Sequence, residues 1–269
     1  MSPIIKTLFA AGLVLSFASC QKVINVDLND SDSRYIISGE ITDAPGPYYV
    51  TLSRSKNFDE NNDFPMVNGA FAIVKDVTNG TIDTLTEESP GRYRTNTTAG
   101  IAGHTYELSM VIGEETFTAS TTMPLTAVTI DSLYVRRSDF GTDDYFIVPV
   151  FTDPAGRGNN YLLRQYVNGR LIKGSVPRND EATDGRTVEF PLYYDTEEES
   201  GNPVINNGDT VTVALLCIDK PVYEFYRTLE QTTDQNSGTP ANPISNIKGG
   251  AIGVFNAATI RTRSEIASF

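Results

Sequence analysis

The sequence predicts a mostly β protein made of two β-sandwich-like domains, with one substantial helix in the C-terminal part of the chain. Short stretches in which apolar and polar residues alternate recur along most of the sequence, as expected for half-buried strands. Gly, Pro, Asn and Asp separate these stretches about every ten residues, a spacing typical of β-sandwiches. Only one segment has a convincing helical spacing of apolar residues.

Residues 1–19 have the features of a lipoprotein signal peptide. Lys6 provides a positive charge, residues 7–15 form an apolar segment, and the small residues Ala18 and Ser19 precede Cys20. The apolar segment is shorter than the ~20 residues that a membrane-spanning helix needs. We therefore expect cleavage before Cys20 and attachment of a diacylglyceryl group to its thiol, which would anchor the mature protein in a membrane.

One position in this segment departs from the usual lipoprotein pattern. Phe17 stands three residues before Cys20, where Leu is usual, so an ordinary secretory signal followed by a coincidental cysteine is the alternative. Lipidation explains the cysteine count, because Cys217 is the only other cysteine and would have no disulfide partner. Gln21 replaces the Asp that marks inner-membrane lipoproteins in enteric bacteria. We therefore expect an outer-membrane lipoprotein, with the cell surface favoured over the periplasmic face.

The charge of the chain excludes some partners. The formal net charge is −13 at pH 7, whereas binding to nucleic acid requires clustered Lys and Arg. An acidic chain also lacks the polybasic segment that would bind anionic lipid, so the lipid on Cys20 is the expected membrane anchor. Residues 20–33 are rich in Asp and Asn and are expected to form a tether. Asp30 and Asp32 could belong to a calcium loop, but a solvated linker is the favoured interpretation.

The first expected domain, residues 34–124, consists of strands separated by turns. Pro45 and Pro47 exclude a helix between the first two strands, and Asn79 with Gly80 is a hairpin signal. The expected strands are 35–41, 48–53, 67–75, 81–85, 90–94, 103–111 and 116–120.

The second expected domain, residues 125–269, contains further strands and the helix. Asp219 is a suitable N-cap, Pro221 lies in the first turn, and the apolar spacing indicates a helix at about residues 220–232 whose stripe plugs the end of this sandwich. The expected strands are 128–136, 145–151, 160–167, 187–194, 209–218 and 251–257.

Several short motifs resemble those of the Bacteroidota envelope lipoprotein family known as domain of unknown function 4249. They are the lipobox at Cys20 and the segments 67–70, 91–93, 103–106, 153–154 and 246–255. The resemblance covers nearly the whole mature chain and implies a role beside TonB-dependent outer-membrane transporters, without implying a chemistry. The first domain is expected to be transthyretin-like or Ig-like in fold, and it resembles transthyretin-like or carboxypeptidase-regulatory sandwiches, which are usually non-catalytic modules.

Candidate catalytic and metal-binding residues are few. His104 is the only histidine, so any histidine-dependent mechanism must use it, but no nucleophile motif or ligand spacing accompanies it. Cys217 lies in an apolar run and is expected in the core. Residues 59–63 begin like an EF-hand loop, yet Phe64 and Ala70 occupy the positions of the required Gly and Glu. The acidic residues Asp139, Asp143, Asp144, Asp195, Glu197, Glu198 and Glu199 are expected in solvated loops.

These observations and the resemblance predict a non-catalytic binding or accessory subunit of a TonB-dependent nutrient transporter, without cofactor or metal. Loops 57–64 and 235–250 are the expected contact segments, because long loops in compact domains are commonly functional. The alternatives are a surface glycoside hydrolase that uses two carboxylates, and a structural or adhesin-like surface protein. The ligand is not predicted.

Overall fold

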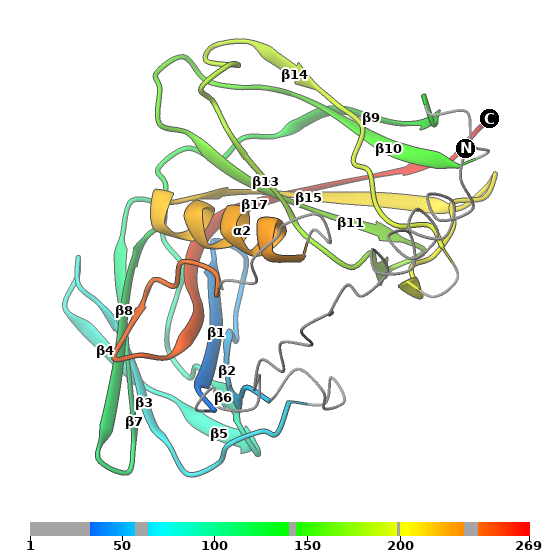
Figure 1. Cartoon of the computed structure of the whole chain (residues 1–269). Coiled ribbons are helices and arrows are strands. Elements are labelled where there is room, and N and C mark those ends of the chain that lie inside the picture. The colour runs from blue at the N-terminus through cyan, green and yellow to red at the C-terminus, as the bar shows by residue number, and fades with distance from the viewer. Residues whose placement is uncertain (1–32, 57–63, 140–143, 198–199, 234–241) are drawn as a thin grey trace, which may run out of the picture. The chain divides into compact units, whose positions relative to one another are not determined.

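Strands dominate the structure, as the alternating pattern predicts. The computed structural model describes residues 33–56, 64–139, 144–197, 200–233 and 242–269, and these fold into three sheets and one helix (Figure 1). The predicted mostly β class is therefore confirmed. The expected leader and tether, including Cys20, lie outside the described residues, as does nearly all of loop 57–64 and half of loop 235–250.

The largest sheet has nine strands in the order β12-β11-β15-β17-β1-β2-β6-β5, with β13 paired to β11. Its strands are β1 (Tyr35–Thr42), β2 (Tyr49–Arg54), β5 (Thr86–Ser89), β6 (Arg92–Arg94), β11 (Asn160–Val167), β12 (Arg170–Leu171), β13 (Val176–Asn179), β15 (Thr210–Ile218) and β17 (Ile252–Ile266).

Two smaller sheets complete the β structure. The five-stranded sheet has the order β16-β8-β7-β3-β4, and the three-stranded sheet has the order β14-β10-β9. Their strands are β3 (Phe71–Asp76), β4 (Thr81–Thr84), β7 (Thr105–Ile112), β8 (Glu115–Thr122), β9 (Ile130–Arg137), β10 (Tyr145–Thr152), β14 (Thr187–Glu189) and β16 (Ile247–Lys248).

Each smaller sheet packs on a different part of the large sheet and buries its own apolar core. In the first sandwich, Ile37 and Val50 of the large sheet pack with Leu108 and Phe117 of the five-stranded sheet. In the second, Leu163, Val213 and Leu215 of the large sheet pack with Ile147 and Phe151 of the three-stranded sheet. In β2, β7 and β8 of the first sandwich buried residues alternate with more exposed ones, whereas β10, β11 and β15 of the second sandwich contain runs of consecutive buried residues.

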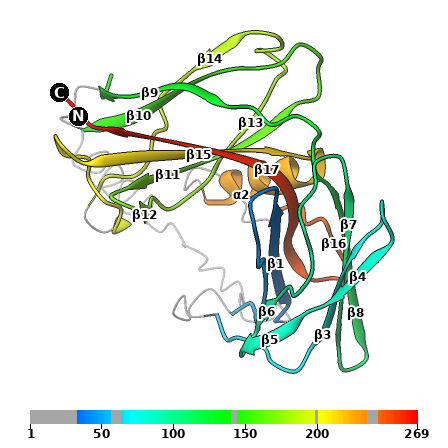
Figure 2. The ribbon, with the colours of Figure 1, turned by 180° about the vertical axis from the view of Figure 1, so that it is seen from behind.

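Strand β17 belongs to both sandwiches. Its first half pairs in parallel with β1, from Ile252 to Ala258, and its second half pairs antiparallel with β15, from Thr259 to Ile266 (Figure 2). Asp43 marks the change of partner, because its Oδ1 accepts a hydrogen bond from the Ile260 N–H (2.8 Å) and its Oδ2 one from Arg261 (2.7 Å). Strand β17 is therefore much longer than the expected strand 251–257. Its first half belongs to the first sandwich, although it lies in the sequence after residue 124, where the second domain is expected to begin.

Helix α2 (Lys220–Thr233) agrees closely with the expected helix. The Asp219 Oδ1 accepts a hydrogen bond from the Val222 N–H (3.1 Å), which confirms the predicted N-cap. The apolar stripe, however, does not plug the end of a sandwich. Val222 and Phe225 pack on Leu162, Leu216 and Val254, so the helix covers the outer face of β11, β15 and β17.

The remaining differences concern segments without a simple alternating pattern. Of the expected strand 187–194, only Thr187–Glu189 forms, because Pro191 interrupts the pairing and Leu192 makes only a single bridge to Ile147. Strand β5 was not expected, since its sequence, Thr-Glu-Glu-Ser, has no apolar residue.

Candidate functional site

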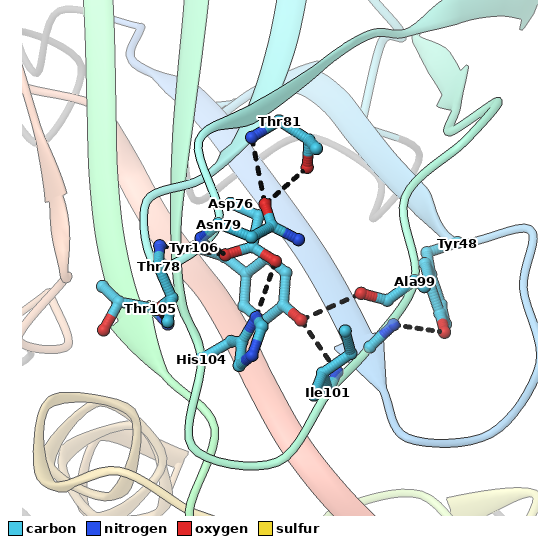
Figure 3. A network of polar contacts seen from close by, with 11 residues as sticks. Tyr48, Asp76, Thr78, Asn79, Thr81, Ala99, Ile101, His104, Thr105 and Tyr106 are labelled. Carbon is cyan, nitrogen blue, oxygen red and sulfur yellow. Dashed lines mark hydrogen bonds and ion pairs between the residues drawn. The ribbon is translucent and has the colours of Figure 1, made fainter.

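His104 lies in a network of polar contacts at one end of the first sandwich (Figure 3). Its Nδ1 is 2.8 Å from Oδ2 of Asp76, the last residue of β3, whose side chain is almost fully buried. The other oxygen of Asp76 accepts hydrogen bonds from the N–H groups of Thr78 (3.0 Å) and Asn79 (3.3 Å). The His104–Asp76 pair thus connects the β3–β4 turn to the start of β7.

Two tyrosine hydroxyls hold the loop beside this pair. The Tyr106 hydroxyl donates to the Ala99 carbonyl (2.9 Å) and accepts from the Ile101 N–H (2.8 Å). The Tyr48 hydroxyl accepts from the Gly100 N–H (3.1 Å). Burial raises the pKa of Tyr106, so its hydroxyl stays protonated at neutral pH. The loop is therefore held in one conformation by three donor–acceptor pairs.

A pocket of about 190 Å³ lies between this loop and strand β4, and the buried Asp83 is in its wall. Oδ2 of Asp83 accepts hydrogen bonds from the N–H groups of Asn96, Thr97 and Thr98 and from the Thr98 hydroxyl, at 2.7 to 2.9 Å. Burial by itself raises the pKa of Asp83, but these hydrogen bonds outweigh burial and hold the pKa below its ordinary value. Asp83 is therefore ionised at neutral pH.

The arrangement is suited to holding loops and gives no sign of nucleophilic catalysis. No described serine or cysteine forms a hydrogen bond with His104, and its carboxylate partner is engaged with a turn. Cys217 lies in the core of the second sandwich, where its Sγ accepts from the Val128 N–H (3.5 Å). Burial raises the pKa of this thiol, which keeps it protonated and unreactive.

A second polar cluster, which the sequence analysis missed, lies between the loops that follow β10 and β13. One oxygen each of Asp153, Asp180 and Asp184 lies within 4.8 Å of the other two, and the first two residues are 1% and 2% exposed. Tyr161 and the Gly185 N–H donate to Asp153. The backbone N–H groups of Gly158 (2.7 Å) and Asn159 (2.9 Å) donate to Asp180, and that of Gly156 (2.7 Å) donates to Asp184.

The three negative charges of this cluster can be stabilised in two ways, by a bound cation or by the backbone N–H donors. Calcium binds oxygen ligands at 2.3 to 2.6 Å, so one ion could contact all three carboxylates. The backbone N–H donors stabilise the same charges without an ion and fix both loops. The available signal in the sequence was the Asp153-Pro154 step followed by Gly156 and Gly158, a composition that marks a tight loop.

The other acidic candidates lie in loops, as expected, where they are described. Asp139 pairs with Arg136 (2.6 Å), and the Asp195 Oδ1 accepts from the Glu197 N–H (2.9 Å) inside its own turn. Asp144 accepts through its backbone carbonyl from the Ser138 N–H (2.8 Å). The remaining members of this set, Asp143, Glu198 and Glu199, and the calcium-like run 59–63, lie outside the described residues.

Most of the chain matches a known protein family. The sequence pattern of domain of unknown function (DUF4249) matches residues 21–264. The chain belongs to this family. None of the curated proteins with which the chain was compared matches it. Within the described residues, no helix has the length and apolar composition to cross a membrane.

The motif 246–255, on which the resemblance to this family rested most, has a structural role. The Asn246 side chain donates to the Phe255 carbonyl (2.8 Å) and accepts from the Phe255 N–H (2.9 Å), which closes the turn before β17. Gly253 has a φ of 132°, and a Cβ there would lie 1.9 Å from the Ile37 carbonyl oxygen. Only glycine allows β17 to approach β1 this closely.

Proposed function

We propose that this DUF4249 protein is an outer-membrane lipoprotein that acts as a non-catalytic binding subunit of a TonB-dependent nutrient transporter. The observation that carries the proposal is the position of the family match, which begins at residue 21, directly after Cys20. The family match therefore begins one residue after the expected mature N-terminus, Cys20. A lipid anchor restricts diffusion to the membrane and raises the effective concentration of a membrane partner.

The polar clusters support a binding role over a hydrolytic one. A carboxylate-based glycosidase needs one carboxylic acid whose pKa is raised, so that it can protonate the leaving group. Asp83, the carboxylate in the pocket beside His104, has a lowered pKa instead. In the cluster of Asp153, Asp180 and Asp184, the first two residues are almost inaccessible to a substrate.

Affinity purification tests the proposed partner. The full-length protein with a C-terminal tag is extracted from native membranes in mild detergent, purified and analysed by mass spectrometry. We expect a TonB-dependent transporter at near-stoichiometric yield. Cys20→Ser, expressed at the same level, is the matched control and should recover much less transporter, because it loses the membrane anchor. Recovery of the wild-type lipoprotein alone would contradict the proposal.

A further inference from the structure

A second pocket, of about 350 Å³, lies in the other half of the molecule. It is bounded by the C-terminal half of α2, by the connection from β12 to β13 and by the segment that follows β14. Pockets that bind small ligands typically measure ~300 to 1,000 Å³ and combine aromatic walls with a few polar groups. The residues that matter for its chemistry are Gln165, Lys173, Tyr193, Tyr194, Tyr226 and Glu230.

The aromatic rings in the walls come from the segment after β14, which carries Tyr193 and Tyr194, and from α2. Tyr193 and Tyr194 pack edge-on against Phe146 of β10, with ring centroids 4.8 and 5.5 Å apart. The Tyr194 hydroxyl donates to the Pro203 carbonyl (3.1 Å), and burial raises the pKa of Tyr194 to about 12. Tyr226 comes from α2. Rigid tyrosine rings offer flat, amphipathic surfaces at a low cost in conformational entropy.

Gln165 in the wall carries an unused hydrogen-bond acceptor. The side chain is 2% exposed, and its Nε2 donates to the Leu192 carbonyl at a long 3.4 Å. No described residue donates to its Oε1. Oε1 is covered from solvent, and a buried acceptor without a donor is unfavourable. Rotation of the side chain towards the pocket would let a ligand O–H or N–H group supply the hydrogen bond that the free protein lacks.

The charges around the pocket favour a neutral ligand. Lys173 and Glu230 carry opposite signs, and Lys173 already donates to the Ser200 carbonyl (2.6 Å). A charged ligand would therefore meet one repulsive group, whereas a purely apolar ligand would leave the Gln165 acceptor unpaired. The pocket therefore suits a ligand that is uncharged and that carries a hydrogen-bond donor. A ring with an apolar face and several hydroxyl groups has both properties.

We infer that this pocket binds a neutral sugar ring, with its C–H face on the tyrosines and a hydroxyl donating to Gln165. The inference rests on the proposed binding function and names the chemical class of the ligand. A single ring suits the size of the pocket, and stacking on tyrosine makes the contact weak. Binding in the millimolar range is expected for one ring.

Saturation-transfer NMR tests the inference with purified full-length protein in detergent. The probes are the methyl glycosides of glucose, galactose, mannose and N-acetylglucosamine, with p-cresol as an aromatic probe that lacks a sugar ring. We expect transfer to the C–H protons of at least one glycoside. Tyr193→Ala should weaken that binding about tenfold or more. Tyr134→Ala should change it less than about twofold, because Tyr134 has a similar exposure (37% against 42%) but lies outside the pocket.

Gln165→Met separates binding from folding. This variant keeps the side-chain volume and removes the unpaired acceptor, so we expect an unchanged or higher Tm together with weaker glycoside binding. Binding of p-cresol but of no glycoside would overturn the inference, as would glycoside binding that Tyr193→Ala and Gln165→Met leave unchanged. Transporter co-purification is measured separately, so loss of sugar binding with retained transporter would refute this inference alone.

Discussion

Arg164 of β11 and Glu40 of β1 form a two-pronged ion pair, with nitrogen–oxygen distances of 2.8 and 2.6 Å. Asn256 of β17, one of the two strands that lie between β11 and β1, donates to the same carboxylate (3.0 Å), and Tyr226 of α2 contacts Arg164. Burial lowers the pKa of Arg164, but the hydrogen bonds and charge of Glu40 outweigh this effect, so the net pKa is raised. The pair therefore joins strands of the two sandwiches across β15 and β17.

Removing one partner of this pair should destabilise the fold. Arg164→Met removes the cationic partner of Glu40, whose side chain is only 28% exposed, and we expect the free energy of unfolding to fall by about 2 kcal/mol. The double variant with Glu40→Gln should recover part of the loss, because no unpaired charge remains. Urea denaturation measures both. Arg157→Met is the control, since Arg157 is mostly exposed and lies 3.9 Å from Asp184; its effect should stay below about 0.5 kcal/mol.

His104→Ala should lower stability without abolishing function. The change removes the contact with Asp76, and we expect a loss of about 1 kcal/mol in the free energy of unfolding. Thermal unfolding and transporter co-purification are the two measurements. A folded His104→Ala protein that no longer binds the transporter would show that His104 acts in binding, contrary to the structural role described above.

Asp83 should make stability depend on pH in the acidic range. Its pKa in the folded protein lies below the ordinary value of 3.8. The stability that its ionised form contributes is therefore complete above about pH 5 and is lost as the pH falls through the folded pKa. Asp83→Asn should be less stable than the wild type at pH 6, and the difference should shrink towards pH 2.5. A difference that is independent of pH would contradict the ionised carboxylate.

Cys20→Ser should release the protein from membranes. Without the thiol no diacylglyceryl group can be attached, so the variant should appear in the soluble fraction and fail to incorporate radiolabelled palmitate. Globomycin, which blocks the lipoprotein signal peptidase, should leave the wild type as a longer precursor. Normal labelling and membrane retention of Cys20→Ser would exclude lipidation at this residue and favour an ordinary secretory signal.

Local patterns in the sequence were sufficient for the β class, most strands and the helix. Alternation at Ile37, Leu52, Leu108 and Met110 reflects burial on one face of a strand, which is a local consequence of chain geometry. The N-cap at Asp219 likewise depends only on neighbours, so the start of α2 could be predicted. Membership of the DUF4249 family also followed from short motifs.

Tertiary structure decided which strands share a sheet and which polar residues meet. The second half of β17 is rich in Arg, Thr, Ser and Glu, and it forms a strand because β15 pairs with it. Asp153 and Asp180 come together only when two loops fold onto each other, and Gln165 acquires its unpaired acceptor only through burial. These relationships depend on contacts between distant segments, for which neighbouring residues carry no signal. Strand β17 pairs with strands of both sandwiches, a relationship that a division of the sequence at residue 124 does not describe. The division into two domains at that residue stays a prediction.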